Sequence, residues 1–153
     1  MKSWFCALLL VFLSQRTLSK FEQLLRPGLP ELHVVFDNSH EVRSGNKIDS
    51  TTAFSKPSLS WNADPKALHT VIMIDVDAPS KNDPHLSDFV HWLAVNIHGQ
   101  SVSNAYELLS YRGPRPPAGK GEHRYYLLVF KQQSRISKDV ESRERCVLEF
   151  SFI

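Results

Sequence analysis

The chain has 153 residues, of which 42% are hydrophobic and 22% are charged, and its formal net charge is +2. This length suits one domain with a hydrophobic core, and this composition excludes disorder as the default expectation. The basic excess lies in the first 19 residues, because without Lys2 and Arg16 the 18 basic side chains become 16, equal to the 16 acidic ones. The charge of the remaining chain therefore predicts no nucleic-acid partner.

The first 19 residues are typical of a secretory signal peptide. A basic lead at Lys2 precedes an apolar run from Trp4 to Leu13, and Thr17 and Ser19 are small residues of the kind that a signal peptidase reads. The run is shorter than the roughly 20 residues of a membrane-spanning helix. We therefore expect a secreted, extracellular protein without a transmembrane span, divided into a signal peptide at 1–19 and one domain at 20–153. The alternative is an uncleaved anchor or a buried hydrophobic N-terminus.

Short apolar runs separated by Pro, Gly, Asn and Asp predict a chain built mainly of β-strands. Helices are expected only as single turns, at Phe21–Leu25 and Asn104–Ser110. In chain order, the predicted strands are Leu32–Phe36, Ser58–Trp61, Val71–Val76, Val90–Ile97, His123–Gln132 and Cys146–Ile153. So many strands without long helices must cover one another's faces, which predicts a sandwich of sheets.

Polar side chains gather where three of these strands begin or end. Asp75 and Asp77 follow the apolar run of the third predicted strand. Strand alternation predicts that one face of the next strand carries His91, Leu93, Val95 and Ile97, and that the other carries Trp92, Ala94 and Asn96. The same alternation groups His123, Tyr125, Leu127 and Val129. We therefore expect two acids, two histidines and a tyrosine to converge on one site.

Two histidines beside a tyrosine predict a site for a small anion. A neutral histidine donates from one ring nitrogen and a protonated one from both, so His91 and His123 beside Tyr125 can hold phosphate or carboxylate oxygens. Asp75 can orient a histidine or accept from an ammonium group. Each residue alone has a simpler interpretation: a single histidine is more often a hydrogen-bonded core or rim residue. The 75–80 stretch alone is more often a turn capped by Asp and Ser, in which a cis bond before Pro79 is allowed.

Other classes of site fit the sequence less well. The 113–120 loop suggests a phosphate-binding loop, but Ala118 stands where glycine is required, Gly121 stands where Ser or Thr is required, and a strand follows instead of a helix. No Gly-x-Ser-x-Gly turn of a serine hydrolase occurs. The mixed charges between 131 and 145 predict a solvated loop. Metal binding stays open on residue type alone, although the spacing matches no metal motif and no cofactor is expected; the possible ligands are Asp75, Asp77, His85, His91 and His123.

Three stretches together resemble the phosphatidylethanolamine-binding protein family, which includes the Raf kinase inhibitor proteins. They are Asp75-Val-Asp-Ala-Pro-Ser80, His91-Trp-Leu-Ala-Val-Asn96 and Pro116-Pro-Ala-Gly-Lys-Gly-Glu-His-Arg-Tyr125, with Lys56-Pro-Ser-Leu-Ser-Trp61 upstream, so the resemblance covers about 32–132. It implies a mainly β fold, an antiparallel β-sandwich with short peripheral helices, and a small pocket for phosphorylethanolamine-like head groups. By position, the residues that match the pocket are Asp75, His91, Pro116, His123 and Tyr125, and Pro117 extends a stiff wall beside them.

The chain departs from the family pattern in three places. Val76 replaces the usual proline between the two acids. Arg115 replaces a common glycine before the proline pair, where it could narrow the pocket or add a cation for phosphate. The family normally continues through a further strand and a C-terminal helix, so we expect the domain to be incomplete at its C-terminus.

We therefore expect a secreted, non-enzymatic binding protein that takes a phospholipid head group or another small phosphate-containing anion. The resemblance also implies an alternative from another class, a protein-interaction module whose partner is a protease or a kinase. That module would act as a protease inhibitor or a signalling modulator. Hydrolysis abolished by a single Asp or His change would indicate an enzyme instead.

Overall fold

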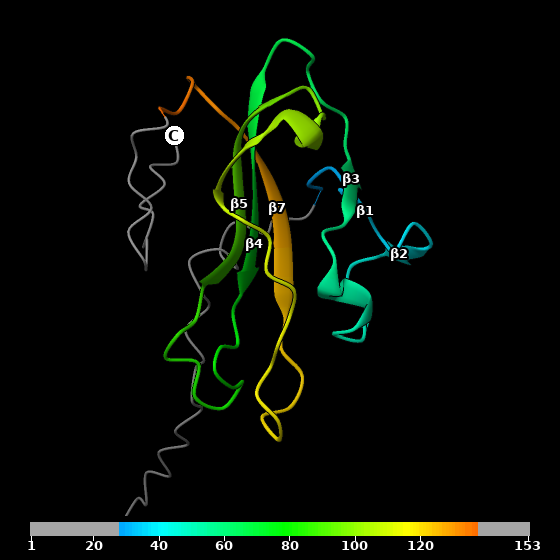
Figure 1. Cartoon of the computed structure of the whole chain (residues 1–153), viewed down its shortest axis with the longest axis vertical. Helices are drawn as coiled ribbons and strands as arrows, with labels where there is room; N and C mark the ends of the chain where they lie inside the picture. Colours follow the sequence, from blue (N-terminus) through cyan, green and yellow to red (C-terminus); the bar gives the residue numbers. More distant parts are fainter. Residues whose placement is uncertain (1–27, 138–153) are drawn as a thin grey trace, which may run out of the picture.

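The computed structural model describes residues 28–137, which form two antiparallel sheets that pack face to face (Figure 1). In the smaller sheet the order is β2 (His40–Val42), β1 (His33–Phe36) and β3 (Ser58–Ser60). In the larger sheet it is β6 (Tyr106–Leu109), β5 (Phe89–His98), β4 (Leu68–Asp75) and β7 (Tyr125–Lys131). The only regular helical elements within the described range are two 3-10 turns, η2 (Thr52–Phe54) and η3 (Val102–Asn104). The architecture is mainly β, which confirms the predicted fold class.

Strand β4 is buried on both faces and separates two hydrophobic clusters. The inter-sheet core consists of Val71, Met73, Trp92, Ala94 and Ile97. Leu59 of β3 and Trp61, the residue after β3, pack against this core. The outer-face cluster consists of Ile72, Ile74, Val76, Leu93 and Val95. Full burial of each such side chain stabilises a fold by about 1.5–3 kcal/mol. Because β4 has no solvated face, its residues Val71–Ile74 are all apolar.

Most of the predicted strands are present. The strands predicted at Leu32–Phe36, Ser58–Trp61, Val71–Val76, Val90–Ile97 and His123–Gln132 correspond to β1, β3, β4, β5 and β7, with small shifts at their ends. Strand β2 and turn η2, each of three residues, were not predicted. The elements predicted at Phe21–Leu25 and Cys146–Ile153 lie outside the described residues. Between 28 and 137, no helix is long and apolar enough to cross a membrane.

The helical turn predicted at Asn104–Ser110 is wrong. Turn η3 ends at Asn104, and the residues that follow form the edge strand β6, in which Tyr106 pairs with Val95 and Leu109 pairs with Leu93. Glutamate and leucine favour helices in isolation. Pairing with the free edge of β5 satisfies the backbone groups of this segment instead, so tertiary contact overrides local propensity.

An irregularity in β5 lies at Asn96, whose φ is 59°. The pairing with β4 shifts there, so that Ile97 joins Trp92 in the inter-sheet core. The predicted face of Ile97 is therefore wrong, because one extra residue in a strand reverses the alternation. The Asn96 amide donates to the Ile136 carbonyl (2.8 Å), and its oxygen accepts from the Ile136 N–H (2.9 Å). These bonds hold the segment after β7 against the outer-face cluster, on which Ile136 packs.

The segment after β6 crosses to the smaller sheet and packs on η2. The Tyr111 hydroxyl donates a hydrogen bond to the carbonyl of Ala53 (2.6 Å). At Gly113, an added Cβ would lie 2.7 Å from the carbonyl oxygen of Ala53 and 2.9 Å from that of Phe54. Both neighbours are backbone atoms, so only glycine permits this approach. The contact fixes the start of the proline-rich loop that leads into β7.

We expect Gly113→Ala to lower the free energy of unfolding by about 1–3 kcal/mol, because the new methyl group forces backbone to move. Urea denaturation followed by circular dichroism measures the change. The matched control is Ala118→Ser in the exposed part of the same loop, for which the change should stay within about 0.5 kcal/mol. Equal stability of the two variants would show that η2 does not constrain this segment.

Candidate functional site

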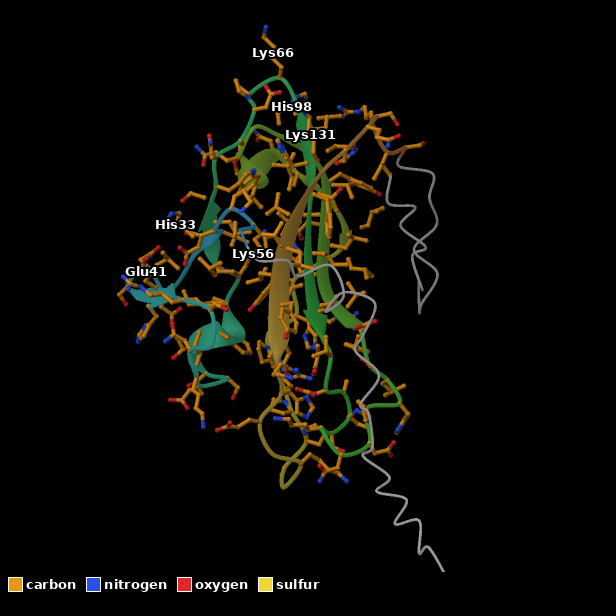
Figure 2. The ribbon with its side chains drawn as sticks, turned by 180° about the vertical axis from the view of Figure 1, so that it is seen from behind. His33, Glu41, Lys56, Lys66, His98 and Lys131 are labelled. Carbon is orange, nitrogen blue, oxygen red and sulfur yellow. The ribbon has the colours of Figure 1, made fainter. Side chains whose placement is uncertain are left out.

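The predicted site residues gather at one end of the larger sheet, where β4 ends and β5 and β7 begin. Asp75, the last residue of β4, pairs with Phe89 on one side and with Tyr125 on the other. The loops 76–88 and 114–124 leave this end of the sheet, in green and yellow at the bottom of Figure 1. Figure 2 labels His98 and Lys131 near the opposite end. Antiparallel pairing therefore brings together residues that are far apart in the sequence.

Asp75 and His123 form a buried hydrogen-bonded pair. The distance from His123 Nδ1 to Asp75 Oδ2 is 2.7 Å, and the two side chains are 1% and 4% exposed. The second carboxylate oxygen of Asp75 accepts from the backbone N–H of Asp77 (2.8 Å). A carboxylate only accepts at neutral pH, so Nδ1 of His123 carries the hydrogen. Asp75 therefore orients the ring, and Nε2 of His123 is left as its free nitrogen.

A second irregularity in β5 places His91 in this group. Met73 pairs with Trp92 and Ile74 with Val90, so His91 is an extra residue between them. Its ring lies edge-on to that of Tyr125, with a centroid distance of 5.2 Å, and Tyr125 packs against the inter-sheet core. The predicted face of His91, shared with Leu93, is therefore wrong, because the bulge turns this residue to the opposite side.

The tautomer of His91 follows from its hydrogen bond. Its Nδ1 lies 2.8 Å from the carbonyl oxygen of Arg112, and a carbonyl only accepts, so Nδ1 donates and Nε2 is the second, unprotonated nitrogen of the neutral ring. Burial lowers the pKa of His91, and the Arg112 carbonyl and the charge of Asp75 offset this only in part. His91 is therefore mainly neutral at neutral pH.

Tyr125 completes the group, which we call the polar cluster: Asp75, His91, His123 and Tyr125. The Tyr125 ring stacks on His123 at a centroid distance of 6.4 Å. Burial, followed by the nearby charge of Asp75, raises the pKa of Tyr125, so its hydroxyl stays protonated. Although Asp75 is close, the buried Tyr125 hydroxyl has no hydrogen-bond partner of good geometry, and neither has the buried Nε2 of His123. Each such group costs about 1–3 kcal/mol when it is left unsatisfied, and functional sites are among the places where such groups occur.

Asp77, the second acid of the motif, is bound by Arg124. Its Oδ2 accepts from the backbone N–H (2.8 Å) and Nε (2.9 Å) of Arg124, and its Oδ1 accepts from Nη2 (3.0 Å). The backbone N–H of Val76 also donates to the Arg124 carbonyl (3.2 Å). The predicted convergence of both acids on one site is therefore replaced by two roles. Asp75 orients a histidine, while Asp77 anchors the loop that carries His123.

The proline-rich loop lies at the same end of the sheet, but its side chains differ in exposure. Pro116 is half-buried and Pro117 is exposed. The N–H of Lys120 donates to the Pro117 carbonyl (3.1 Å), which closes a turn. The Arg115 guanidinium lies 5.6 Å from the ring centre of the exposed Phe54, so this cation is directed toward η2. That the two prolines line a ligand site stays a prediction.

Two residues of the site were missed by the sequence analysis. The carbonyl of Arg112 sets the tautomer of His91, and no sequence signal marks a backbone acceptor that is 21 positions away. The ring of Phe89 lies edge-on to His91 at 5.2 Å. The predicted strand begins at Val90, one residue too late to include Phe89. A strand that begins at Phe89 places this residue on the same face as His91, because the two are separated by one residue.

The described residues contain no group of three His, Cys, Asp or Glu side chains that could hold a metal ion. Two of the possible ligands are already engaged, because His123 Nδ1 binds Asp75 and the Asp77 carboxylate binds Arg124. The geometry therefore gives no support to a metal centre made from these residues.

We expect Arg124→Ala to lower the free energy of unfolding by about 3 kcal/mol, because it leaves the fully buried carboxylate of Asp77 without its guanidinium partner. Thermal and urea unfolding measure the loss. Arg135→Ala, at an exposed arginine beyond β7, is the control, with an expected change within about 0.5 kcal/mol. A loss no larger than that of the control would contradict the anchoring role.

Comparison with known proteins identifies the family. The sequence pattern of the family described as Phosphatidylethanolamine-binding protein matches residues 38–150. A Drosophila melanogaster protein named as odorant-binding protein A5 is 34% identical over 123 residues, which are 80% of this chain and 59% of that protein. A 26 kDa secreted antigen of Toxocara canis is 32% identical over 104 residues, which are 68% and 40% of the two chains. The chain thus spans less than two thirds of the length of these relatives.

Solved structures with a similar fold include one inhibitor and one binding protein. Carboxypeptidase Y inhibitor, in a complex with its cognate proteinase, has a TM-score of 0.62 and 32% identity, over 67% of this chain and 60% of that one. The phosphatidylethanolamine-binding protein of Plasmodium vivax has a TM-score of 0.58 and 29% identity, over 67% and 59% of the two chains. Both similarities cover most of the described residues, so the sandwich is that of this family.

Proposed function

The chain belongs to the phosphatidylethanolamine-binding protein family, and we propose that it is a non-enzymatic protein whose polar cluster binds phospholipid head groups or related small phosphate anions. The observation that carries the proposal is the pair of buried, unpartnered polar atoms, Nε2 of His123 and the hydroxyl of Tyr125. Buried polar groups of folded proteins are nearly always satisfied, so these two atoms suit a ligand that supplies the missing partners.

Each residue of the polar cluster has a distinct role in this proposal. One Nε2 atom of the pair His91 and His123 donates to the phosphate once its ring is protonated, and the Tyr125 hydroxyl donates a further hydrogen bond. Asp75 does not touch the phosphate; it holds His123 in position through the 2.7 Å contact to Nδ1. Pro116 and Pro117 supply the stiff wall of the site.

Secretion is part of the same proposal. The basic lead and apolar run of residues 1–19 support a signal peptide. One relative, from Toxocara canis, is named as a secreted antigen. Detection of the mature protein in the medium of expressing cells, with an N-terminus near Lys20, tests this part of the proposal.

Titration of phosphorylethanolamine into the protein should show saturable binding by calorimetry. At least one of the variants His91→Ala and His123→Ala should weaken the affinity about 10-fold to 100-fold, because a hydrogen bond to a charged group contributes about 1.5–3 kcal/mol. His98→Ala is the matched control, since His98 is exposed and lies at the opposite end of the sheet (Figure 2). The proposal fails if no saturable binding occurs, or if both cluster variants bind as tightly as the wild type.

A protein-interaction module is the second candidate, and one similar structure supports it, because that protein is an inhibitor bound to its proteinase. In this case the chain would inhibit a protease or modulate a kinase through a surface outside the polar cluster. We expect such activity to survive in the His91→Ala/His123→Ala double variant. An inhibition assay with carboxypeptidase Y compares the wild type with the double variant. Equal inhibition would favour this candidate, whereas loss of inhibition in the double variant would show that inhibition depends on the polar cluster.

A further inference from the structure

We propose that the polar cluster takes up one proton when it binds a phosphate oxygen, and that this proton lies between the phosphate and an Nε2 atom of the histidine pair. The inference rests on the proposed function and specifies which end of the head group faces the rings. It arises from the hydrogen bonds that the two rings already make.

Both rings have used their donor nitrogen before any ligand arrives. Nδ1 of His91 donates to the carbonyl of Arg112 (2.8 Å), and Nδ1 of His123 donates to the carboxylate of Asp75 (2.7 Å). Neither partner can donate, so the direction of both bonds is determined. In the neutral state each ring therefore presents Nε2 as an acceptor, and the Tyr125 hydroxyl is the one remaining donor of the cluster.

A phosphodiester oxygen is also only an acceptor. Two acceptors facing each other without a hydrogen form no hydrogen bond, and their lone pairs repel. A proton on Nε2 removes the conflict: it converts the ring to an imidazolium, which donates a charge-assisted bond to the phosphate. With a diester the proton comes from the solvent, whereas a phosphate monoester that already carries a proton can supply it.

The groups that surround His91 keep its imidazole mainly neutral in the free protein. Asp75 of β4 favours the charged ring, as does the Arg112 carbonyl, but burial, the Arg112 guanidinium and His123 oppose it. The net effect is a lowered pKa for His91, and Tyr125 on β7 stays neutral because its own pKa is raised. Among the nearby charges, Asp77 is already paired with Arg124. A phosphate close to the ring adds a second negative charge beside that of Asp75, and so raises the pKa of the imidazole.

The sign of the pH dependence follows from this coupling. The complex holds more protons than the free protein, so affinity rises as pH falls, with a limit of about 10-fold for each pH unit per proton. For His91, the dependence applies above the pKa of its ring in the free protein, which burial holds below the ordinary histidine value of about 6.5, and it disappears at lower pH, where that ring is already charged. Recognition of the ammonium end is different, because neutral Nε2 atoms and Asp75 accept from it without any proton.

The test is calorimetric titration of the full chain with glycerophosphorylethanolamine, whose diester does not titrate near neutral pH. Measurements at pH 7.5 in HEPES and in Tris, which differ in ionisation enthalpy, give the number of protons exchanged. We expect uptake of about one proton and an affinity about 10-fold weaker at pH 8 than at pH 7. Saturable binding with no uptake would overturn the inference and leave the proposed function intact, whereas absence of binding would overturn both.

Glutamine variants locate the proton, because an amide donates without being protonated. His91→Gln and His123→Gln are the test variants, with His98→Gln as the control and thermal unfolding as the check of folding. Proton uptake should fall toward zero in at least one of the two cluster variants that still binds glycerophosphorylethanolamine. It should be unchanged in His98→Gln. Full uptake in both cluster variants would contradict the assignment. As a measurement without substitutions, nitrogen-15 spectra of the free protein at pH 7.5 should show Nε2 of His91 unprotonated; a protonated Nε2 there would also overturn the inference.

Discussion

The pairing of β4 with β5 and β7 is the constraint on which the rest of this structure depends. Because β4 is buried on both faces, its backbone groups must be satisfied by its two neighbours, and its side chains must alternate correctly between two apolar clusters. A slip of one residue would exchange the two clusters, so the register is strongly specified. The same register sets Asp75 opposite Phe89 and Tyr125. The position of the polar cluster is thus a consequence of core packing.

The two acids at the end of β4 have different roles, because Asp77 holds the frame of the fold and Asp75 belongs to the polar cluster. Asp77 is fully buried and saturated by the backbone and guanidinium of Arg124, so it ties the loop before β7 to the end of β4. That loop is thereby fixed, and His123 comes within 2.7 Å of Asp75. The Asp77 carboxylate is satisfied, whereas the polar cluster leaves a ring nitrogen and a hydroxyl open; Nε1 of Trp61 and Nδ1 of His69, elsewhere in the described residues, are also buried without a hydrogen-bond partner. The two open atoms lie in one cluster with His91, and this grouping supports the proposal that the cluster binds a ligand.

Much of this arrangement could be predicted from residue pattern. The apolar run of β4 and the alternation in β7 were sufficient to predict both strands, and the acids and histidines at their ends were sufficient to predict a shared site. The prediction was wrong for Asn104–Ser110, where pairing with β5 outweighed helical propensity. It was also wrong for the faces of Ile97 and His91, because each follows from an extra residue in β5 that no strict period of two contains. The binding role of the prolines was predicted and stays a prediction.

The sequence by itself determined the strand pattern, the family and the residue types at the mouth of the sheet, because these depend on local composition, spacing and motif order. Only the tertiary structure decided that His91 turns toward Tyr125, that Asp77 pairs with Arg124, and which nitrogen of each histidine is free. The physical reason is that these features are set by partners far along the chain, such as the Arg112 carbonyl 21 residues from His91 and the Asp75 carboxylate 48 residues from His123. A hydrogen bond of this kind exists only once the register of the sheet has brought its two ends together.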